Sequence, residues 1–261
     1  QTQALTVIET SLSVFDTSIY SHVAPSSVPA WVRVLTANRI SRSAVEWTDT
    51  FSLFNSGTHN NDWIVSDMRS VEEKGGLSPN CSRVLEQMPG LVESADLFPV
   101  LSSTSYFPSF NIPYFPKIFN YSGYNTTNFN WTTDPRANIF RRDQVTVASL
   151  DDTAALMTQN NWQTDPLSLG NACNAISARC DLNPNSTEAF GGIDAKVVAA
   201  KNFTNLAQDY LGPPIRVQSS QTHATQPPFT FNDPRFQKVP HIGLPTTFDF
   251  PWLTTQAKRI Q

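Results

Sequence analysis

The chain has 261 residues, of which 39% are hydrophobic, 11% aromatic and 15% charged, and its formal net charge is −4 at pH 7. The aromatic content excludes an intrinsically disordered chain, the slight acidity gives no attraction to nucleic acid, and no apolar run reaches the ~18 residues of a membrane-spanning helix. Ser, Thr and Asn replace part of the usual charge, which favours a compartment outside the cytosol.

The chain opens with a predicted strand over residues 4–10, Ala-Leu-Thr-Val-Ile-Glu-Thr. A strand this close to Gln1 indicates that the chain begins inside a fold. Either processing removed earlier residues, or residues before Gln1 are missing. A sheet cut at this point would leave backbone groups unpaired, so we expect a second, smaller polypeptide of the same precursor to pair with it.

Two helices and three strands are predicted next. Pro29 is an early-helix proline, and apolar residues follow it at helical spacing. A capping box at residues 43–46 starts the second helix, with Trp47, Phe51 and Phe54 on its apolar face. Short strands are predicted at residues 63–67, 83–88 and 91–95, the last two joined by a Pro89-Gly90 turn.

The C-terminal half has weaker periodicity. Helices are predicted at residues 147–160 and 201–211, and a strand at residues 193–199. From Gly212 the chain is rich in proline, and we expect an ordered wrap that buries its large aromatic side chains. These side chains are Phe229, Phe231, Phe236, Phe248, Phe250 and Trp252. Helices packed on antiparallel sheet predict an α+β fold, in a single domain over residues 1–261.

Sequons and cysteines indicate the secretory route. Asn-x-Ser/Thr sequons occur at Asn80, Asn120, Asn125, Asn130, Asn185 and Asn202. Residues 120–132 carry three of them and predict a glycosylated surface loop, the alternative being a polar loop without glycans. Cys173 and Cys180 lie seven residues apart near a turn signal, which favours a disulfide over two buried thiols. Cys81 has no evident partner in this chain.

Three segments hold polar residues suited to chemistry. Residues 56–63 combine hydroxyl, imidazole and amide groups, residues 171–179 combine amides with a guanidinium, and residues 135–143 contain three arginines. Amide and guanidinium donors suit an oxyanion hole. The alternative is structural, because Asn-rich turns act as caps and Arg–Asp neighbours form salt bridges. The scattered histidines and three cysteines predict no metal site, and no cofactor is expected.

A series of motifs in one order carries a resemblance to a known family. The motifs are Phe54–Trp63, Leu85–Gly90, Asn111–Pro113, Pro135–Gln144, Asp165–Ser168, Asn174–Arg179, Asp181–Pro184 and Gly191–Asp194. From about Leu5 to Pro245 the chain resembles the phospholipase B-like (lamina ancestor) family of lysosomal glycoproteins. Several motifs in order are more specific than any single one.

The resemblance implies an αββα sandwich of the N-terminal-nucleophile hydrolase type, with two stacked antiparallel sheets between helix layers. It implies that the chain is the larger fragment of a cleaved precursor. Cleavage exposes a Cys as the first residue of this larger fragment. That thiolate attacks an acyl ester or amide while the α-amine takes the proton. Carried over by motif, Thr58, Asn60 and Asn61 lie near the nucleophile. Asn174 becomes an oxyanion donor and Arg179 a positioning cation.

The chain departs from the family pattern at several positions. The nucleophile is expected about ten residues before the strand near Leu5, upstream of Gln1 and outside this chain. His59 stands where the family usually has Tyr, and Phe190 stands where it has His. The family's Cys-x-x-Cys appears here as residues 170–173, and Cys180 occupies a Ser-like position, so the disulfide is expected to have moved.

Two functions follow. The first is a lysosomal phospholipase B-like hydrolase that acts on a lipid or an acyl amide. The alternative is a catalytically silent, glycosylated lysosomal glycoprotein that kept the fold. Both place the protein in the lysosome lumen, with or without a membrane anchor outside this chain. Both include N-linked glycans and the smaller N-terminal fragment as partners.

Overall fold

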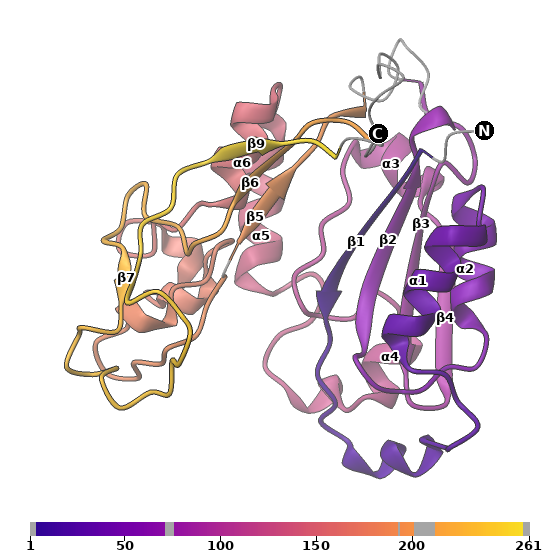
Figure 1. Ribbon diagram of the computed structural model, residues 1–261, viewed down its shortest axis with the longest axis horizontal. Helices are drawn as coiled ribbons and strands as arrows, with labels where there is room; N and C mark the ends of the chain where they lie inside the picture. The colour runs from indigo at the N-terminus through magenta and orange to yellow at the C-terminus, as the bar shows by residue number, and fades with distance from the viewer. Residues whose placement is uncertain (1–3, 71–75, 193, 201–211, 258–261) are drawn as a thin grey trace. The chain divides into compact units, whose positions relative to one another are not determined.

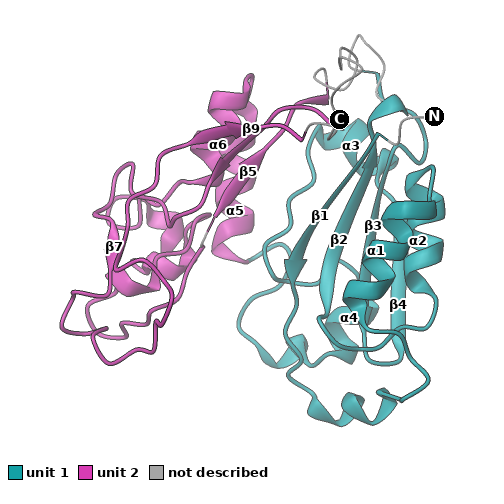
Figure 2. Ribbon diagram, in the orientation of Figure 1, with its two compact units in different colours: residues 1–133 teal, residues 134–261 magenta. Residues whose placement is uncertain are grey.

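The computed structural model describes residues 4–70, 76–192, 194–200 and 212–257. The chain divides into two compact units, residues 1–133 and 134–261 (Figures 1 and 2). Antiparallel sheets and helices occur in both units, which confirms the predicted α+β class. That residues 1–261 act as a single domain, and that the layers are of the N-terminal-nucleophile hydrolase type, stay predictions.

Unit 1 is built on an antiparallel sheet. Its described strands are, in spatial order, β1 (Leu5–Ser11), β2 (Asn61–Asp67), β3 (Ser82–Met88) and β4 (Leu91–Asp96). Spatial order follows chain order, and the Pro89-Gly90 turn joins β3 to β4 with Met88 opposite Leu91. The predicted strands and hairpin are confirmed.

Two helices cover one face of this sheet: α1 (Ala30–Ile40) and α2 (Ala44–Ser52) (Figure 1). α2 begins at the predicted cap, because the Ser43 hydroxyl accepts a hydrogen bond from the Glu46 amide at 3.2 Å. Trp47 and Phe51 are fully buried against Trp63 of β2. The helix ends before Phe54, which is 68% exposed, so its predicted place on the apolar face is wrong.

The opposite face of the sheet packs against the segment that follows β4. Side chains alternate along a strand, so Met88 points away from Leu85 and the α1–α2 layer. Met88 forms a second core with Leu12, Ile19 and Ile118, the last of these in the helix Pro116–Tyr121. The remaining described helices of unit 1 are α3 (Phe98–Thr104), α4 (Pro116–Tyr121) and the 3-10 helices Thr17–His22, Met68–Ser70 and Tyr124–Thr126.

Unit 2 contains the helices α5 (Pro135–Asp143) and α6 (Leu150–Met157). α6 is shorter than the predicted 147–160, because Ser149 caps it by accepting a hydrogen bond from the Asp152 amide at 3.1 Å. An antiparallel sheet joins β5 (Ala195–Val197), β6 (Ile215–Gln218) and β9 (Leu253–Thr255). The predicted 193–199 strand is thus partly confirmed. Ile193 and the whole predicted helix 201–211 lie outside the described residues. The described residues of unit 2 also form 3-10 helices at Gln144–Thr146, Pro166–Ser168, Ala172–Asn174 and Cys180–Leu182.

The proline-rich C-terminal third is an ordered wrap within unit 2, as predicted. β7 (Phe229–Thr230) pairs with β8 (Thr247–Phe248), and Phe229, Phe231 and Phe236 form a small buried core. Phe250 is 39% exposed, so the expectation that every large ring here is buried is wrong for this residue. Within the described residues no helix is both long and apolar enough to cross a membrane.

Candidate functional site

The turn that leads into β2 contains Thr58, Asn60 and Asn61. Gly57 adopts φ +66° in this turn, and a Cβ there would lie 2.5 Å from the Pro89 Cα, so only glycine fits. Asn55 fixes the turn on both sides. Its Oδ1 accepts from the Gly57 amide at 3.0 Å, and its Nδ2 donates to the Met88 carbonyl at 2.8 Å. The turn is therefore rigidly tied to the β3–β4 hairpin.

Gln87 of β3 bonds the same turn directly, and a buried arginine bonds Gln87 in turn. Its Nε2 donates to the carbonyls of Thr58 and His59, both at 3.1 Å, and its Oε1 accepts from Arg33 at 2.7 Å. Arg33 is 4% exposed, and burial lowers its pKa to about 10. The sequence analysis missed Arg33, although its spacing from the buried Ala30 and Ala37 places all three on one face of α1.

Three amide atoms in this turn are buried without a partner. Asn60 donates through Nδ2 to the Gly57 carbonyl at 3.1 Å. The Asn60 Oδ1 and both polar side-chain atoms of Asn61 have no hydrogen-bond partner among the described residues. Leaving such atoms unpaired costs free energy, so a bound polar ligand would gain by pairing with them. Thr58 is exposed, with its hydroxyl 2.9 Å from that of Ser56.

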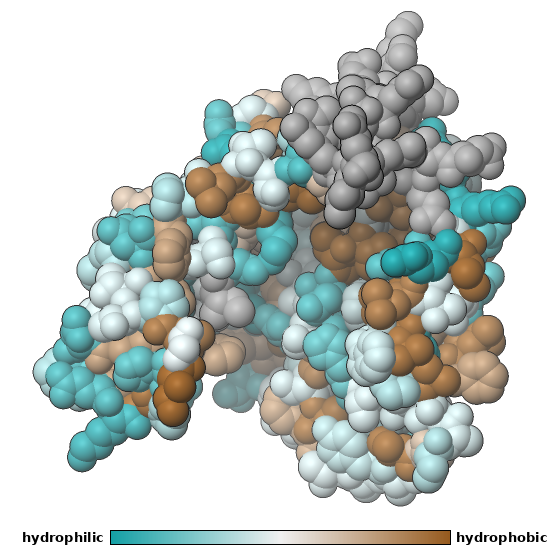
Figure 3. Space-filling view, in the orientation of Figure 1, coloured by the Kyte–Doolittle hydropathy of each residue, from teal (hydrophilic) through white to brown (hydrophobic). Residues whose placement is uncertain are grey.

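An apolar groove borders the turn within unit 1. Its volume is about 570 Å³, and it is lined by Ala30, Trp31, Val34, Leu35, His59 and Trp63. Trp31 and Leu35 expose 68% and 53% of their surface, and Figure 3 shows hydrophobic side chains at the surface over α1. His59 belongs to both the turn and the groove, and its ring meets that of Trp63 edge-on at 6.4 Å. The groove therefore begins where the polar turn ends.

In unit 2 a disulfide closes the segment that contains Asn174 and Arg179. Cys173 and Cys180 are bonded, with their Cα atoms 4.6 Å apart, which confirms the predicted pairing. Cys81 is a buried free thiol. Asn174 is half-buried, and its Nδ2 donates to the Ser168 carbonyl at 3.1 Å. The Asn174 amide group therefore already donates one hydrogen bond within the protein.

Arg179 is fully buried and makes several contacts. It forms a bidentate pair with Asp181 at 2.8 and 2.7 Å. It also donates to the carbonyl of Thr222 at 2.5 Å and to that of Pro227 at 2.9 Å. These bonds tie the disulfide-closed segment to the C-terminal wrap. The predicted role of Arg179 as a cation near the substrate stays a prediction.

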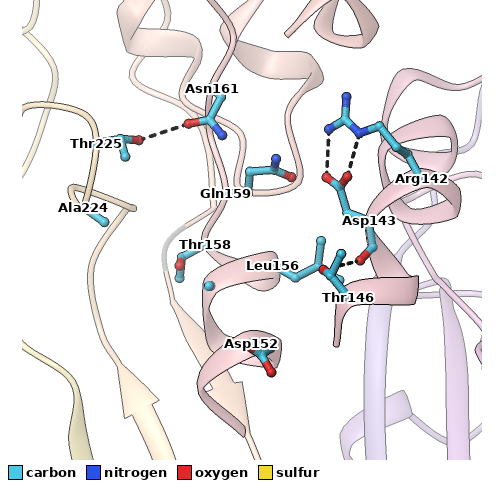
Figure 4. Close-up of a pocket in the computed structure, with 11 residues that line it drawn as sticks. Arg142, Asp143, Thr146, Asp152, Leu156, Thr158, Gln159, Asn161, Ala224 and Thr225 are labelled. Atoms are coloured by element: carbon cyan, nitrogen blue, oxygen red, sulfur yellow. Dashed lines mark hydrogen bonds and ion pairs between the residues drawn. The ribbon is translucent and has the colours of Figure 1, made fainter. Parts of the chain in front are cut away.

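The arginine-rich segment of α5 forms ion pairs beside a second pocket of unit 2. Arg142 contacts Asp143 at 2.6 Å and Asp165 at 2.7 Å, and it holds the pKa values of both carboxyls below their usual range. The pocket has a volume of about 490 Å³ and includes Arg142, Gln159 and Thr225 (Figure 4). The charge of Arg142 is matched by carboxylates, as the structural alternative predicts.

The predicted site residues fall into two groups. Thr58, Asn60 and Asn61 lie together in unit 1, and Asn174 and Arg179 lie on one segment of unit 2. The sequon residues Asn80, Asn120, Asn125, Asn130 and Asn185 are exposed, and Asn202 lies outside the described residues. The part of the chain that the structure describes holds no cluster of three or more His, Cys, Asp or Glu able to bind a metal ion.

Comparison with known proteins identifies the family. The family model described as Phospholipase B matches residues 1–255. The chain belongs to the phospholipase B family. This confirms the resemblance carried by the motifs, including Phe54–Trp63 and Asn174–Arg179.

Phospholipase B relatives occur in distant organisms. "Phospholipase B-like protein A" of Dictyostelium discoideum is 39% identical over 96% of this chain and 45% of its own length. "Phospholipase B-like 1" of Rattus norvegicus is 36% identical over 96% of this chain and 45% of its own. "Putative phospholipase B-like 2" of Caenorhabditis elegans is 37% identical over 96% and 46%. The chain spans less than half the length of these relatives.

Proposed function

We propose that this chain is part of a phospholipase B-like hydrolase that cleaves acyl ester or amide bonds. One observation carries the proposal: in this member of the phospholipase B family, the rigid Thr58–Asn61 turn adjoins an apolar groove. Such a site offers polar groups for an acyl carbonyl and apolar walls for its chain. The nucleophile in this proposal is an N-terminal Cys upstream of Gln1, whose own α-amine acts as the base.

The groove would take the acyl chain. Its volume lies within the range of about 300–1,000 Å³ typical of small-molecule pockets, and its walls are almost wholly apolar. The unpaired Asn61 amide lies on the same face of β2 as Trp63, which lines the groove, because side chains alternate along a strand. An acyl group lying along α1 would therefore bring its polar end towards the Asn60–Asn61 amides.

By the family motif that it belongs to, Asn174 would serve as an oxyanion donor. A tetrahedral intermediate carries a full negative charge, and a preorganised amide stabilises that charge more than it stabilises the substrate. The short loop closed by Cys173 and Cys180 supports this role, because it restricts the backbone on both sides of Asn174. Arg179 would act as a positioning residue through the segment that it holds.

The compartment and the partner chain are part of the same proposal. Exposed sequons at five described positions suit N-linked glycans and passage to the lysosome lumen. Among the described strands β1 lies at one edge of its sheet, and the Ile8 side chain on it is 61% exposed. An exposed apolar edge suits pairing with a further strand, which the smaller N-terminal fragment of the precursor would supply.

The test uses the full-length protein, isolated after processing. N-terminal sequencing of its larger fragment is expected to give Cys as the first residue, and replacement of that Cys by Ala should abolish hydrolysis of acyl esters and amides. An intact fold with another first residue and no hydrolysis would contradict the proposal. The silent-glycoprotein alternative would then be the better account.

A second experiment tests the groove with a matched control. Leu35→Ser should raise KM for long-chain acyl esters while leaving short-chain esters nearly unchanged, because only a long chain reaches α1. Ile40→Ser changes a residue of the same helix that is 60% exposed and does not line the groove. Equal effects of the two substitutions, or equal effects on long and short chains, would contradict the assignment.

A further inference from the structure

A row of carboxyl side chains crosses the sheet of unit 1. Asp62 of β2 lies directly opposite Glu86 of β3, and Glu86 lies directly opposite Glu93 of β4. Directly opposed residues of antiparallel strands have their Cβ atoms about 4.5–5.5 Å apart, and like charges there repel. Asp62 and Glu86 are both fully buried. They point away from Trp63 and Leu85, and so towards the face opposite the α1–α2 layer.

No cation among the described residues is paired with either buried carboxyl. In the hydrogen bonds of the described residues, Glu86 accepts from backbone amides, those of Tyr114 at 2.5 Å and Phe115 at 3.1 Å. Neither oxygen of Asp62 has a hydrogen-bond partner of good geometry in the described chain. Lys117 of α4 pairs with Glu93, at 2.5 Å. Within the described part of the chain, the two buried carboxyls therefore have no countercharge.

The remaining charged groups nearby do not change this balance. Glu9 of β1 adds negative charge near Asp62. Arg33 bonds Gln87, and Arg83 bonds Thr48 of α2, so both arginines serve the other face of the sheet. Two carboxyl groups held this close in a dry site cannot readily both be ionised.

The titration of the pair follows from this setting. Burial raises the pKa of Asp62 to about 7. The nearby Ser109 hydroxyl lowers this pKa by a smaller amount, and the negative charge of Glu9 raises it by a smaller amount. Burial, and then the charge of Asp62, raise the pKa of Glu86 well above its usual value. In the unfolded chain both groups return to ordinary values near 4.

We propose that Asp62 and Glu86 form a proton-binding pair that makes the folded protein more stable at acidic than at neutral pH. Between about pH 4 and pH 7 the folded state binds more protons than the unfolded state, so the stability falls as the pH rises through this window. The pair adjoins the candidate site in sequence, since Asp62 follows Asn61 and Glu86 precedes Gln87.

This inference does not depend on the proposed hydrolase activity, because a silent glycoprotein with the same pair would show the same stability profile. Asp134 is a further buried carboxyl whose pKa is raised by burial, so it adds to the same trend, and the Asp62 and Glu86 variants separate the contribution of the pair from it. Asp143 and Asp165 have lowered pKa values, so the stability they contribute is lost only as the pH falls below the usual range of a carboxyl.

The test measures unfolding of the full-length protein by denaturant at a series of pH values from 4.5 to 7.5. One proton bound only by the folded state changes the unfolding equilibrium constant about tenfold per pH unit, so unfolding should become roughly a hundredfold more favourable across the window. Asp62→Asn and Glu86→Gln each keep the shape and remove one of the two titrating groups, so each should reduce the slope of this profile, and the double substitution should flatten it. Glu93→Gln, in the same row but paired with Lys117, should leave it nearly unchanged.

Equal stability at the two ends of the series, or greater stability at neutral pH, would overturn the proposal. So would a Glu93→Gln profile as flat as those of the buried substitutions. If the variants fail to fold, infrared spectroscopy of the unmodified protein decides. A carbonyl band from protonated carboxyl groups should persist in the folded protein at pH 6 and disappear on unfolding at that pH, and its absence would overturn the proposal.

Discussion

The Gln87 side chain joins Arg33 to the backbone of the Thr58–Asn61 turn. Its oxygen accepts from Arg33 at 2.7 Å, and its nitrogen donates to the carbonyls of Thr58 and His59 at 3.1 Å. The buried cation fixes which way the amide points, because only the oxygen can accept from a guanidinium. Helix α1, strand β3 and the candidate site are thus connected by one amide.

Gln87→Met should therefore destabilise the protein while keeping most of the side-chain volume. The substitution leaves a buried Arg33 donor and two carbonyl groups without their partner, which typically costs about 1–3 kcal/mol. Denaturant unfolding measures the loss. Gln237→Met, at an exposed glutamine, is the control and should change stability by less than about 0.5 kcal/mol. A similar loss in both variants would contradict the role of Gln87.

Gly57→Ala should be far more damaging than Gly170→Ala. Both glycines have positive φ, +66° and +69°, so both substitutions carry the cost of about 1 kcal/mol for a left-handed residue. A Cβ at position 57 would also lie 2.5 Å from the Pro89 Cα, whereas nothing lies within 4 Å at position 170. The difference in Tm between the two variants should therefore report the cost of the contact with Pro89, since the cost of the left-handed backbone is common to both. Equal shifts in Tm would show that the turn can move away from Pro89.

Removal of the Cys173–Cys180 disulfide by a double substitution to Ala should lower stability by about 2.5 kcal/mol on the chain-entropy model. The bond closes a short loop, so it restricts the unfolded chain less than a long loop would. A reductant should lower the stability of the unmodified protein and leave the double variant unchanged. An equal response of both proteins to the reductant would contradict the assignment of the stabilisation to this bond.

Asn174→Ala should lower turnover of acyl substrates about 10²–10³-fold with the fold intact, as for loss of one oxyanion donor. The residue is half-buried and donates one hydrogen bond to Ser168, so the cost in stability should be small. Kinetics and denaturant unfolding of the same preparation check both points. A variant that is destabilised without a selective loss of turnover would make Asn174 a structural amide.

Arg179→Lys should instead act mainly on stability. The guanidinium makes a bidentate pair with Asp181 and donates to two carbonyls of the C-terminal wrap, and an ammonium group cannot reproduce this planar geometry. The hydrogen bonds that Lys cannot make leave buried acceptor oxygens without a partner, which typically costs about 1–3 kcal/mol. Arg235→Lys, at an exposed ion pair with Asp233, is the matched control and should be nearly neutral. Full stability of Arg179→Lys would contradict the anchoring role.

Some features of this protein follow from short stretches of sequence. The capping box at Ser43, the Pro89-Gly90 hairpin and the Cys173–Cys180 pairing each involve residues within a few positions of each other. The interactions that form them are local, so sequence patterns predict them. The order of several such motifs also identified the family, although it did not test the roles of Asn174 and Arg179.

Other features were decided by tertiary contacts. Asp62 and Glu86 stand opposite each other only because β2 and β3 pair in one register, and a shift of either strand by one residue would turn its carboxyl to the other face. Arg33 is buried because Gln87 and the Phe51 carbonyl lie within its reach in the folded sheet and helices. Sequence spacing alone carries no information on contacts between residues so far apart in the chain, and these contacts set the charge and shape of the site.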